Sequence, residues 1–316
     1  MIKTLRSQSL AIAYMDEGPA DAPVALLLHG WPDDAHGMAP IAMRMRRQGY
    51  RTVVPWLRGF GPTRFLFDHI IRDGRGVALA QDAIDLLDGL NITRCVVIGH
   101  DWGARAGYHL AAIAPKRLRA LVTLGLGYSP NGRFETPGFA QARLWWYQWL
   151  MTTEGGSAKV REDPVGFARM QWETWSPGGW FSEADFAQTA ESFLNPDWPA
   201  ITLHGYRSRW QAEPVDPHYA KTQQRIEATD SLGVPTLMIV GREDGADLPE
   251  RSEGKDECFT SGLRRIVLDG VGHFPAREAP DAVAEAINTF LSTFGARRST
   301  GQVRPPREKA RPAREK

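Results

Sequence analysis

A strand, a tight turn and a helix follow one another between residues 94 and 107, and this stretch constrains the fold more than any other. The apolar run from Cys95 to Ile98 is typical of a buried strand, and an Ala-rich helical sequence follows it. Between them stand Gly99-His100-Asp101-Trp102-Gly103. Glycines two residues before and after one polar residue let the backbone turn sharply, because no Cβ atoms clash there. We therefore expect the Asp101 side chain to project from the end of the strand.

This turn resembles the nucleophile elbow of the α/β-hydrolase fold, whose central residue is serine in the common version. Here the central residue is Asp101. A serine alkylated at carbon becomes an ether, which water does not cleave, whereas an alkylated carboxylate becomes an ester that water can hydrolyse. Asp101 therefore predicts attack on a saturated carbon, as in epoxide opening or halide displacement, and argues against an ordinary esterase or peptidase. The plain alternative is a solvated aspartate that caps a helix.

Strands alternate with helices along the rest of the chain, which predicts a mainly parallel sheet. We expect an edge strand at 9–16, further strands at 23–28, 50–56, 118–126, 234–240 and 263–268, and helices at 39–48, 75–90 and 280–294. The fold class implied by the resemblance is α/β, with an eight-stranded, mostly parallel sheet flanked by helices and an inserted helical cap.

Composition excludes several classes of protein. Hydrophobic residues make up 42% and charged residues 24% of the chain, and the net charge is +1, so neither a nucleic-acid partner nor a membrane partner is indicated. The two cysteines do not make a disulfide framework, and we find no signal peptide. A cytoplasmic enzyme fits these observations. No histidine has metal-ligand spacing, and no cofactor is expected.

The segment His29-Gly30-Trp31-Pro32 ends an apolar run and resembles the HG-x-P loop of the family. The resemblance implies that the backbone N–H of Trp31 contributes to an oxyanion hole, and that the N–H of Trp102 completes it. The segment that begins at Arg58 resembles the family's R-G-x-G turn. Two residues before Arg58, Trp56 stands where the family usually has an aspartate.

His273 follows the last expected strand in the sequence Gly-Val-Gly-His-Phe, after an acid at the end of the preceding strand. The order nucleophile, acid, histidine matches the family. His273 would take a proton from the attacking water, and Asp244 would orient its ring and offset the imidazolium charge. Glu243 and Asp247 are nearby rivals, and the G-x-x-D spacing favours Asp244.

Eight of the eleven tryptophans fall between Tyr128 and Asp216, in short helical pieces broken by Pro and Gly. This segment resembles the helical cap that covers the active site in many members of the family. The tryptophans can form the core of the cap or line a pocket for an apolar substrate. The expected domains are a hydrolase core at 1–127 and 217–295, a cap at 128–216 and a disordered basic tail at 296–316. That tail has eight Lys or Arg residues against two Glu.

Two tyrosines in the cap help to decide between the possible reactions. An opening epoxide needs hydrogen-bond donors opposite the nucleophile, and soluble epoxide hydrolases use two cap tyrosines, one in a Tyr-Gln pair and one in a Tyr-Arg pair. This chain has Tyr147-Gln148 and Tyr206-Arg207 at similar places. The resemblance therefore implies that Tyr147 and Tyr206 bind the epoxide oxygen. Each tyrosine could instead be a core aromatic with its hydroxyl satisfied elsewhere.

A dehalogenase built on the same scaffold is the alternative enzyme, in which Trp102 and Trp149 would cradle the halide. Fluoroacetate dehalogenases bind the substrate carboxylate with an Arg next to the nucleophile and another one helical turn later. Here Trp102 and Arg105 occupy those positions, so half of the clamp is missing. Arg105 is then expected to form a structural ion pair. A non-enzymatic ligand receptor with this fold is a further alternative.

The combined prediction is an epoxide hydrolase that acts on an apolar or aromatic epoxide and water. Asp101 forms a hydroxyalkyl ester, and water activated by His273 hydrolyses it to a vicinal diol. The oligomeric state stays open, with a homodimer as one expectation. The residues expected to line the substrate pocket are Phe60, Gln148, Trp149 and Phe274.

Overall fold

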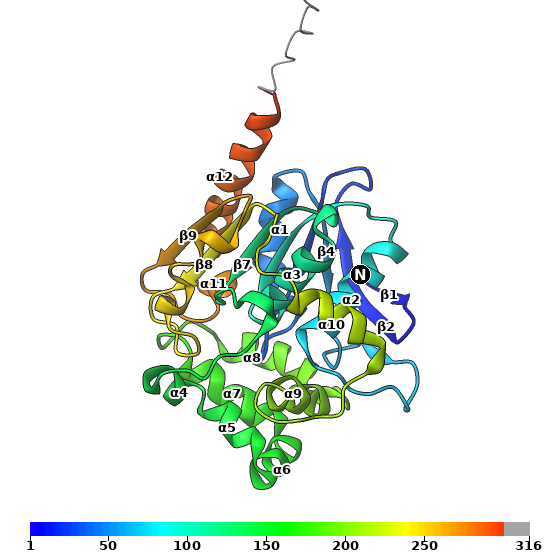
Figure 1. Cartoon of the computed structure of the whole chain (residues 1–316), viewed down its shortest axis with the longest axis vertical. Coiled ribbons are helices and arrows are strands. Elements are labelled where there is room, and N and C mark those ends of the chain that lie inside the picture. Colours follow the sequence, from blue (N-terminus) through cyan, green and yellow to red (C-terminus); the bar gives the residue numbers. More distant parts are fainter. Residues whose placement is uncertain (300–316) are drawn as a thin grey trace, which may run out of the picture.

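The structure is a computed structural model that describes residues 1–299, and the side chains of residues 1–293. One sheet crosses the molecule, and a group of helices lies below it (Figure 1). Within the described residues the strands are β1 (Ile2–Arg6), β2 (Leu10–Glu17), β3 (Val24–Leu28), β4 (Arg51–Pro55), β5 (Arg64–Phe65), β6 (Cys95–His100), β7 (Leu118–Leu124), β8 (Thr236–Gly241) and β9 (Leu263–Leu268).

Eight strands follow one another in the order β1-β2-β4-β3-β6-β7-β8-β9, and the two-residue β5 pairs with β2. The pairs β1/β2 and β2/β4 are antiparallel, whereas every pair from β4 to β9 is parallel. This confirms the predicted mostly parallel sheet. The expected edge strand at 9–16 is wrong in one respect, because β1 lies outside β2. The exposed β1 has no apolar alternation that could have indicated it.

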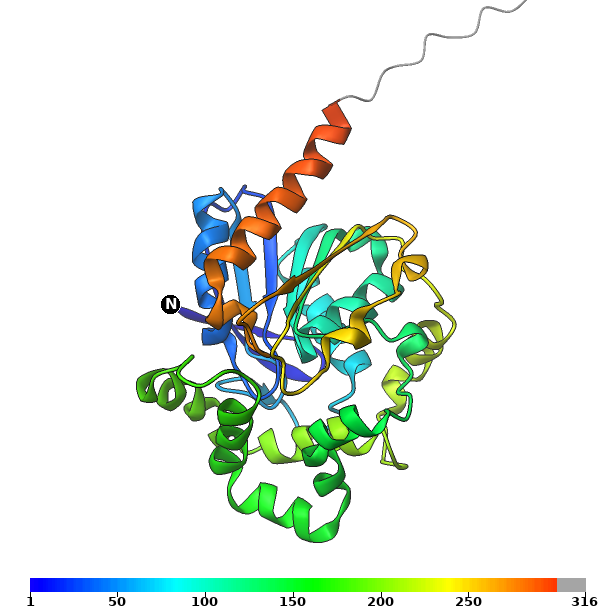
Figure 2. The same cartoon turned by 90° about the vertical axis from the view of Figure 1, so that its left-hand side faces the viewer.

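Helices cover both faces of the sheet. In Figure 2, α1 and α12 lie against one face, and α2 and α3 lie against the other. The α-helices that flank the sheet are α1 (Ala39–Arg47), α2 (Gly76–Gly89), α3 (Trp102–Ile113), α10 (Ala220–Glu227), α11 (Pro275–Glu278) and α12 (Pro280–Ser299). Because α12 continues to Ser299, the first four residues of the predicted tail are helical. The rest of that tail lies outside the described residues.

Six helices between β7 and β8 form a separate group, which we call the cap and which lies below the sheet in Figures 1 and 2. They are α4 (Phe139–Leu144), α5 (Trp146–Thr152), α6 (Glu154–Glu162), α7 (Pro164–Thr174), α8 (Glu183–Ala190) and α9 (Trp198–Arg207). Capping bonds explain where several begin: the side chains of Thr153, Asp163 and Ser182 accept backbone N–H bonds at the starts of α6, α7 and α8.

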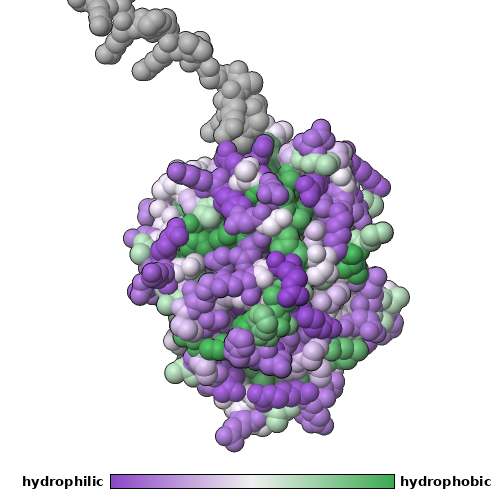
Figure 3. All heavy atoms as spheres, turned by 90° about the vertical axis from the view of Figure 1, so that its right-hand side faces the viewer, coloured by the Kyte–Doolittle hydropathy of each residue, from purple (hydrophilic) through white to green (hydrophobic). Residues whose placement is uncertain are grey.

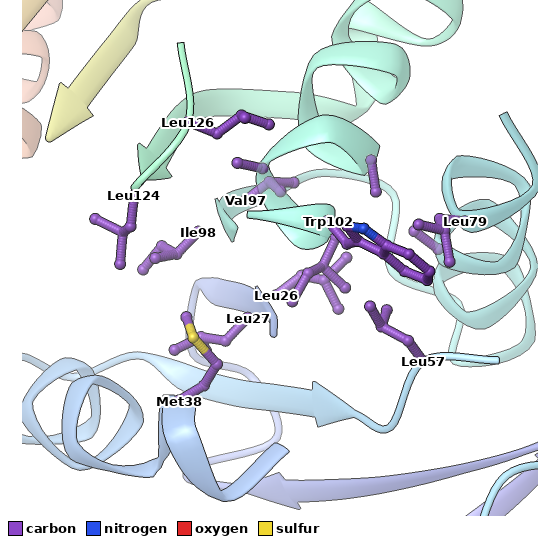
Figure 4. Packing of buried hydrophobic residues seen from close by; sticks show 14 of the residues in the cluster. Leu26, Leu27, Met38, Leu57, Leu79, Val97, Ile98, Trp102, Leu124 and Leu126 are labelled. Atoms are coloured by element: carbon purple, nitrogen blue, oxygen red, sulfur yellow. The ribbon is translucent and has the colours of Figure 1, made fainter. Parts of the chain in front are cut away.

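The core lies around β6, the central strand, all of whose residues are buried. Its neighbours β3 and β7 are also buried, apart from the exposed Arg119 of β7, as expected of strands that are covered on both faces. Figure 4 shows apolar side chains from β3, β6 and β7 packed together, with the ring of Trp102 reaching toward Leu57 and Leu79. On the face drawn in Figure 3, hydrophilic side chains surround smaller apolar patches. In the part of the chain that the structure describes, no helix is both long and apolar enough to cross a membrane.

Two glycines bring β6, α3 and β3 into contact at the turn. A Cβ atom on Gly99 would stand 2.2 Å from the carbonyl oxygen of Gly103, and one on Gly103 would stand 2.1 Å from that of Leu28. Both obstacles are backbone atoms, which cannot rotate away as a side chain could. The glycines thus permit a close approach of helix and strand that no other residue allows.

We predict that Gly103→Ala lowers the free energy of unfolding by at least about 2 kcal/mol, because the added methyl group overpacks this contact. Chemical denaturation followed by circular dichroism measures the change. Gly155→Ala is the matched control, since nothing lies within 4 Å of a Cβ atom on this helical glycine. The control should unfold at the same denaturant concentration or a higher one. Equal destabilisation by both changes would contradict the packing argument.

Candidate active site

Asp101 lies between β6 and α3 with φ 44° and ψ −107°. Residues other than glycine rarely adopt this backbone conformation. The backbone N–H of Trp31, in the loop after β3, donates to Asp101 Oδ1 at 2.9 Å. Because β3 and β6 are parallel neighbours, their carboxyl ends bring this N–H and the carboxylate together. The structure therefore places the Trp31 N–H where the sequence predicted an oxyanion donor, already bonded to Asp101.

His273 lies on the other side of the carboxylate. Its Nε2 atom is buried, has no hydrogen-bond partner and stands 3.8 Å from Asp101 Oδ2. Its Nδ1 atom donates to Asp244 Oδ2 at 2.8 Å. Backbone N–H groups of Ala246 and Asp247 donate to Asp244 Oδ1 and fix its carboxylate. The structure brings Asp101, His273 and Asp244 into the predicted line.

The two rivals of Asp244 do not contact His273. Glu243 is exposed to solvent. Asp247 is half-buried and lies 2.9 Å from Arg251 Nε, and burial raises its pKa to about 6. A second carboxyl group thus stands directly behind Asp244, and its burial could not be read from the sequence.

The carboxylates of Asp244 and Asp101, on either side of the imidazole, determine its charge. Burial alone would lower the pKa of His273, but the charge and hydrogen bond of Asp244, together with the charge of Asp101, raise it to about 9. The ring is therefore an imidazolium at neutral pH. Loss of the charge on Asp101 would weaken this effect and leave the imidazole a better base.

The other two histidines near the turns, His29 and His100, are both hydrogen-bonded to neighbouring loops. His29 accepts the N–H of Leu57 at Nε2 and donates from Nδ1 to the carbonyl of Gly30. His100 donates from Nε2 to the carbonyl of His273, and burial lowers its pKa to about 4. Both rings are neutral, and their hydrogen bonds hold neighbouring loops together.

Tyr147 and Tyr206 come from α5 and α9, and both are buried. Their ring centroids lie 5.2 Å apart, and the indole of Trp31 contacts both, at 5.6 Å from Tyr147 and 4.9 Å from Tyr206. Burial, followed by other contributions that include the charge of Asp101, raises the pKa of each phenol. The two hydroxyl groups therefore keep their protons.

Gln148 determines the direction of the hydrogen bond at Tyr147. Trp210 donates its indole N–H to Gln148 Oε1 at 3.1 Å, and Arg209 donates to the same oxygen at 3.4 Å. Since both groups can only donate, the amide oxygen must face them. The amide NH₂ then donates to the Tyr147 hydroxyl oxygen at 3.0 Å. Tyr147 is an acceptor in this bond, and its own O–H remains available to donate.

The cap is hydrogen-bonded to the loop that carries Trp31. The indole N–H of Trp31 donates to Thr202 Oγ1 on α9 at 3.0 Å, and that of Trp172 on α7 donates to the carbonyl of Pro32 at 2.7 Å. Asp34, fully buried in the same loop, accepts from Ser192 Oγ at 2.6 Å. We call the loop of residues 29–34, which carries Trp31, the oxyanion loop. It therefore forms one hydrogen-bonded unit with the cap.

Asp34 also explains the role of Trp56, which stands where the family usually has an aspartate. The indole N–H of Trp56 donates to Asp34 Oδ2 at 3.1 Å, so this side chain anchors the end of β4 to the oxyanion loop. Burial alone would raise the pKa of Asp34, but hydrogen bonds from His36 and Ser192 hold it below its usual value. The next turn is anchored by Arg58, whose guanidinium pairs with Asp82 at 2.6 Å.

The remaining predicted pocket residues are aromatic side chains around these groups. Phe60 and Phe274 are fully buried. Phe60 packs against Trp102, and Phe274 packs against His273. Trp149 packs against Trp210 and donates its indole N–H to the carbonyl of Ala142 at 3.0 Å. That donor is therefore already engaged.

The prediction that Arg105 forms a structural ion pair is wrong. Within the described residues it forms no ion pair, and its Nε atom is buried without a partner. Its guanidinium lies 4.4 Å from the ring centroid of Phe134 instead. Burial, with a smaller contribution from the charge of Arg209, lowers the pKa of Arg105 to about 9. Spacing along the chain could not indicate that no acid would reach this side chain.

Comparison with known proteins agrees with this architecture. Residues 23–280 match the family model described as the alpha/beta hydrolase fold. Epoxide hydrolase 3 of Siraitia grosvenorii is 33% identical over 86% of this chain and 92% of its own length. Epoxide hydrolase A of Mycobacterium tuberculosis is 24% identical over 90% of this chain and 95% of its own. The crystal structure of a candidate epoxide hydrolase from Klebsiella pneumoniae has 38% identity and a TM-score of 0.85, and covers 92% of this chain and 96% of that one.

The chain therefore belongs to the α/β-hydrolase fold family. Among the residues that the structure describes, no group of three or more His, Cys, Asp or Glu side chains could hold a metal ion.

The raised pKa of His273 predicts how stability depends on pH. The folded protein keeps the imidazole proton up to about pH 9, whereas the unfolded chain loses it near pH 6.5. This contribution is complete below pH 6.5 and is lost as the pH rises to 9. We expect the free energy of unfolding to fall by about 2 to 3 kcal/mol more over this range than in His273→Gln. Denaturant titrations of both proteins at several pH values measure it, and parallel curves would contradict the assignment.

Proposed function

We propose that this protein is an epoxide hydrolase that uses Asp101 as its nucleophile. The observation that carries the proposal is the pair of contacts at one carboxylate: the Trp31 N–H bonds Oδ1, and the His273 imidazole faces Oδ2. The similarity to two proteins named epoxide hydrolase, at 33% and 24% identity, supports the same reaction. Residues 128–216 act as the cap domain in this proposal.

In the first step Asp101 Oδ2 attacks an epoxide carbon, because the Trp31 N–H occupies Oδ1. A carbon–oxygen bond forms to Asp101 as the ring carbon–oxygen bond breaks. Tyr147 and Tyr206 donate hydrogen bonds to the oxygen that leaves the ring and develops negative charge. Gln148 supports this role, because its amide keeps the Tyr147 O–H pointing away from itself. One of the two phenols passes its proton to this oxygen, so the step yields a hydroxyalkyl ester and a phenolate.

In the second step water attacks the ester carbonyl. Ester formation removes the charge on Asp101, so the pKa of His273 falls and the imidazolium gives its Nε2 proton to the phenolate. The neutral Nε2 atom can then accept a proton from the water. The N–H groups of Trp31 and Trp102 hold the oxyanion, and Asp244 offsets the imidazolium charge. The bond between Cγ and Oδ2 of Asp101 then breaks, and the vicinal diol leaves with Oδ2 and with the proton held by His273. The oxygen of the water stays on Asp101, whose carboxyl proton returns to His273 and restores the imidazolium. The aromatic walls of the site suit an apolar epoxide.

One observation favours a dehalogenase as a second candidate. The buried indole N–H of Trp102 faces the Tyr206 hydroxyl beside the nucleophile, where it could bind a halide. The other proposed halide donor, Trp149, is already bonded to Ala142. Halide release from haloalkanes and haloacids, measured beside diol formation from styrene oxide, separates the two reactions.

Trapping of the intermediate tests the nucleophile and the base together. We predict that His273→Gln, incubated with styrene oxide, gains the mass of one epoxide per chain, because the ester forms but is not hydrolysed. Intact-mass spectrometry detects the adduct, and peptide mapping should find it on Asp101. The variant Asp101→Asn in the same background is the control and should gain no mass. A folded His273→Gln protein without an adduct would contradict the mechanism.

The direction of the Tyr147 hydrogen bond gives a separate prediction. In Gln148→Glu the new carboxylate accepts the Tyr147 proton, so the phenol can no longer donate to the epoxide. We expect the rate of ester formation to fall by roughly 10- to 100-fold, as in Tyr147→Phe. Single-turnover measurements of tryptophan fluorescence report this step.

The control for this change is Gln188→Glu, which adds the same charge at an exposed position of α8. It should react at the rate of the unaltered protein. If Gln148→Glu also retains that rate, Gln148 does not act through Tyr147.

A further inference from the structure

One arginine of the cap, Arg209, lies against the two phenols of the proposed reaction site. It stands two residues after the end of α9, and α5 and α9 lie side by side in the cap (Figure 1). Its guanidinium carbon is 4.3 Å from the ring centroid of Tyr206. It also donates to Gln148 Oε1 at 3.4 Å, and the amide of Gln148 donates to the Tyr147 hydroxyl at 3.0 Å. A single cation therefore contacts one phenol directly and reaches the other through one amide.

No carboxylate neutralises Arg209 among the side chains of residues 1–293. The nearby Arg207, in contrast, pairs with Glu213 at 2.8 Å. The second hydrogen bond of Arg209 goes to the backbone carbonyl of Gly205 at 3.1 Å, and its guanidinium carbon lies 4.6 Å from the ring centroid of Phe134. These contacts fix the position of the cation without cancelling its charge. Because the surroundings are partly buried, the charge acts more strongly on the phenols than it would in water.

Both phenol oxygens face a hydrogen-bond donor. The amide of Gln148 donates to Tyr147, and the indole N–H of Trp102 faces the hydroxyl of Tyr206. Burial raises the pKa of both phenols, and the charge of Arg209 opposes this rise at each of them. An oxygen that faces a donor in this way can hold negative charge after its own proton has left. The surroundings of the two phenols therefore suit a transient phenolate.

We propose that Arg209 is a positioning residue for ring opening, because its charge stabilises the phenolate that forms when Tyr147 or Tyr206 protonates the epoxide oxygen. This inference rests on the proposed function and adds a residue to its first step. As the ring carbon–oxygen bond breaks, the epoxide oxygen takes the phenol proton, and the electron pair of the O–H bond stays on the phenol. The guanidinium is already in place, so no group has to reorient as this charge develops.

The contribution of Arg209 is confined to ester formation. Once the imidazolium of His273 has returned a proton to the phenolate, no anion remains beside the guanidinium. The bond from Arg209 to the carbonyl of Gly205 also gives this side chain a structural role at the end of α9. A structural role alone would not depend on the substrate, so a pair of substrates can separate the two roles.

The test compares 2-benzyloxirane with its analogue that carries a difluoromethylene group between the ring and the oxirane. The fluorine atoms make the leaving alkoxide less basic, so it depends less on a proton from a phenol. We expect Arg209→Met to lower kcat/KM for 2-benzyloxirane at least about tenfold, and to lower it several-fold less for the fluorinated compound. Equal losses for both compounds, or no loss for either, would overturn the proposal.

Two further variants serve as controls. Arg161→Met removes a charge from an exposed position of α6 and should leave both values unchanged. Arg209→Lys keeps the charge and should recover most of the lost kcat/KM for 2-benzyloxirane. If Arg209→Met does not fold, Arg209→Gln replaces it. A loss in Arg209→Lys as large as in Arg209→Met would show that the shape of the side chain matters and not its charge, which contradicts the proposal.

Single-turnover measurements with styrene oxide separate the two chemical steps. Ester formation should slow at least about tenfold in Arg209→Met, whereas hydrolysis of the ester should keep its rate. Slower hydrolysis with unchanged ester formation would overturn the proposal. If the unaltered protein opens none of the three epoxides, the proposed function is wrong, and this inference falls with it. If the protein opens them and Arg209→Met reacts equally fast, the function stands and Arg209 has no part in it.

Discussion

The backbone of Asp101 is the constraint on which the rest of the site depends. Its positive φ is unfavourable for any residue with a side chain, by about 1–3 kcal/mol, and it persists because the surrounding structure leaves no alternative. Gly99 and Gly103 let α3 press against β6 and β3, and the Trp31 N–H then meets the carboxylate. The packing of α3 against the sheet therefore also fixes the orientation of the Asp101 carboxylate.

The electrostatics of the site follow from that placement. A carboxylate fixed near His273 joins Asp244 in holding a proton on the imidazole. In the proposed function, the charge that makes Asp101 a nucleophile therefore also keeps His273 from acting as a base before the ester has formed. In the proposed reaction, esterification of Asp101 removes that charge, so the two steps occur in order without any movement of the backbone. Asp247, behind Asp244, adds a third negative group whose charge depends on pH near 6.

Much of this could be predicted from the sequence, because the informative features are local. The elbow glycines, the apolar strands and the order Asp101, Asp244, His273 all depend on short spacings, and the parallel sheet followed from the alternation of elements. The strand β1 was missed because it is exposed and carries no apolar pattern. The unpaired state of Arg105, the orientation of Gln148 and the bond from Trp56 to Asp34 depend on residues far apart in the chain. No spacing rule reports such contacts.

The hydrogen bonds between the cap and the oxyanion loop limit how molecules can enter and leave. If the cap swung away from the sheet, it would break the bonds from Trp31 to Thr202, from Trp172 to Pro32 and from Ser192 to Asp34 together. An enzyme built in this way keeps its catalytic groups assembled while it exchanges ligands. Ligands must then exchange while the cap stays bonded to the oxyanion loop.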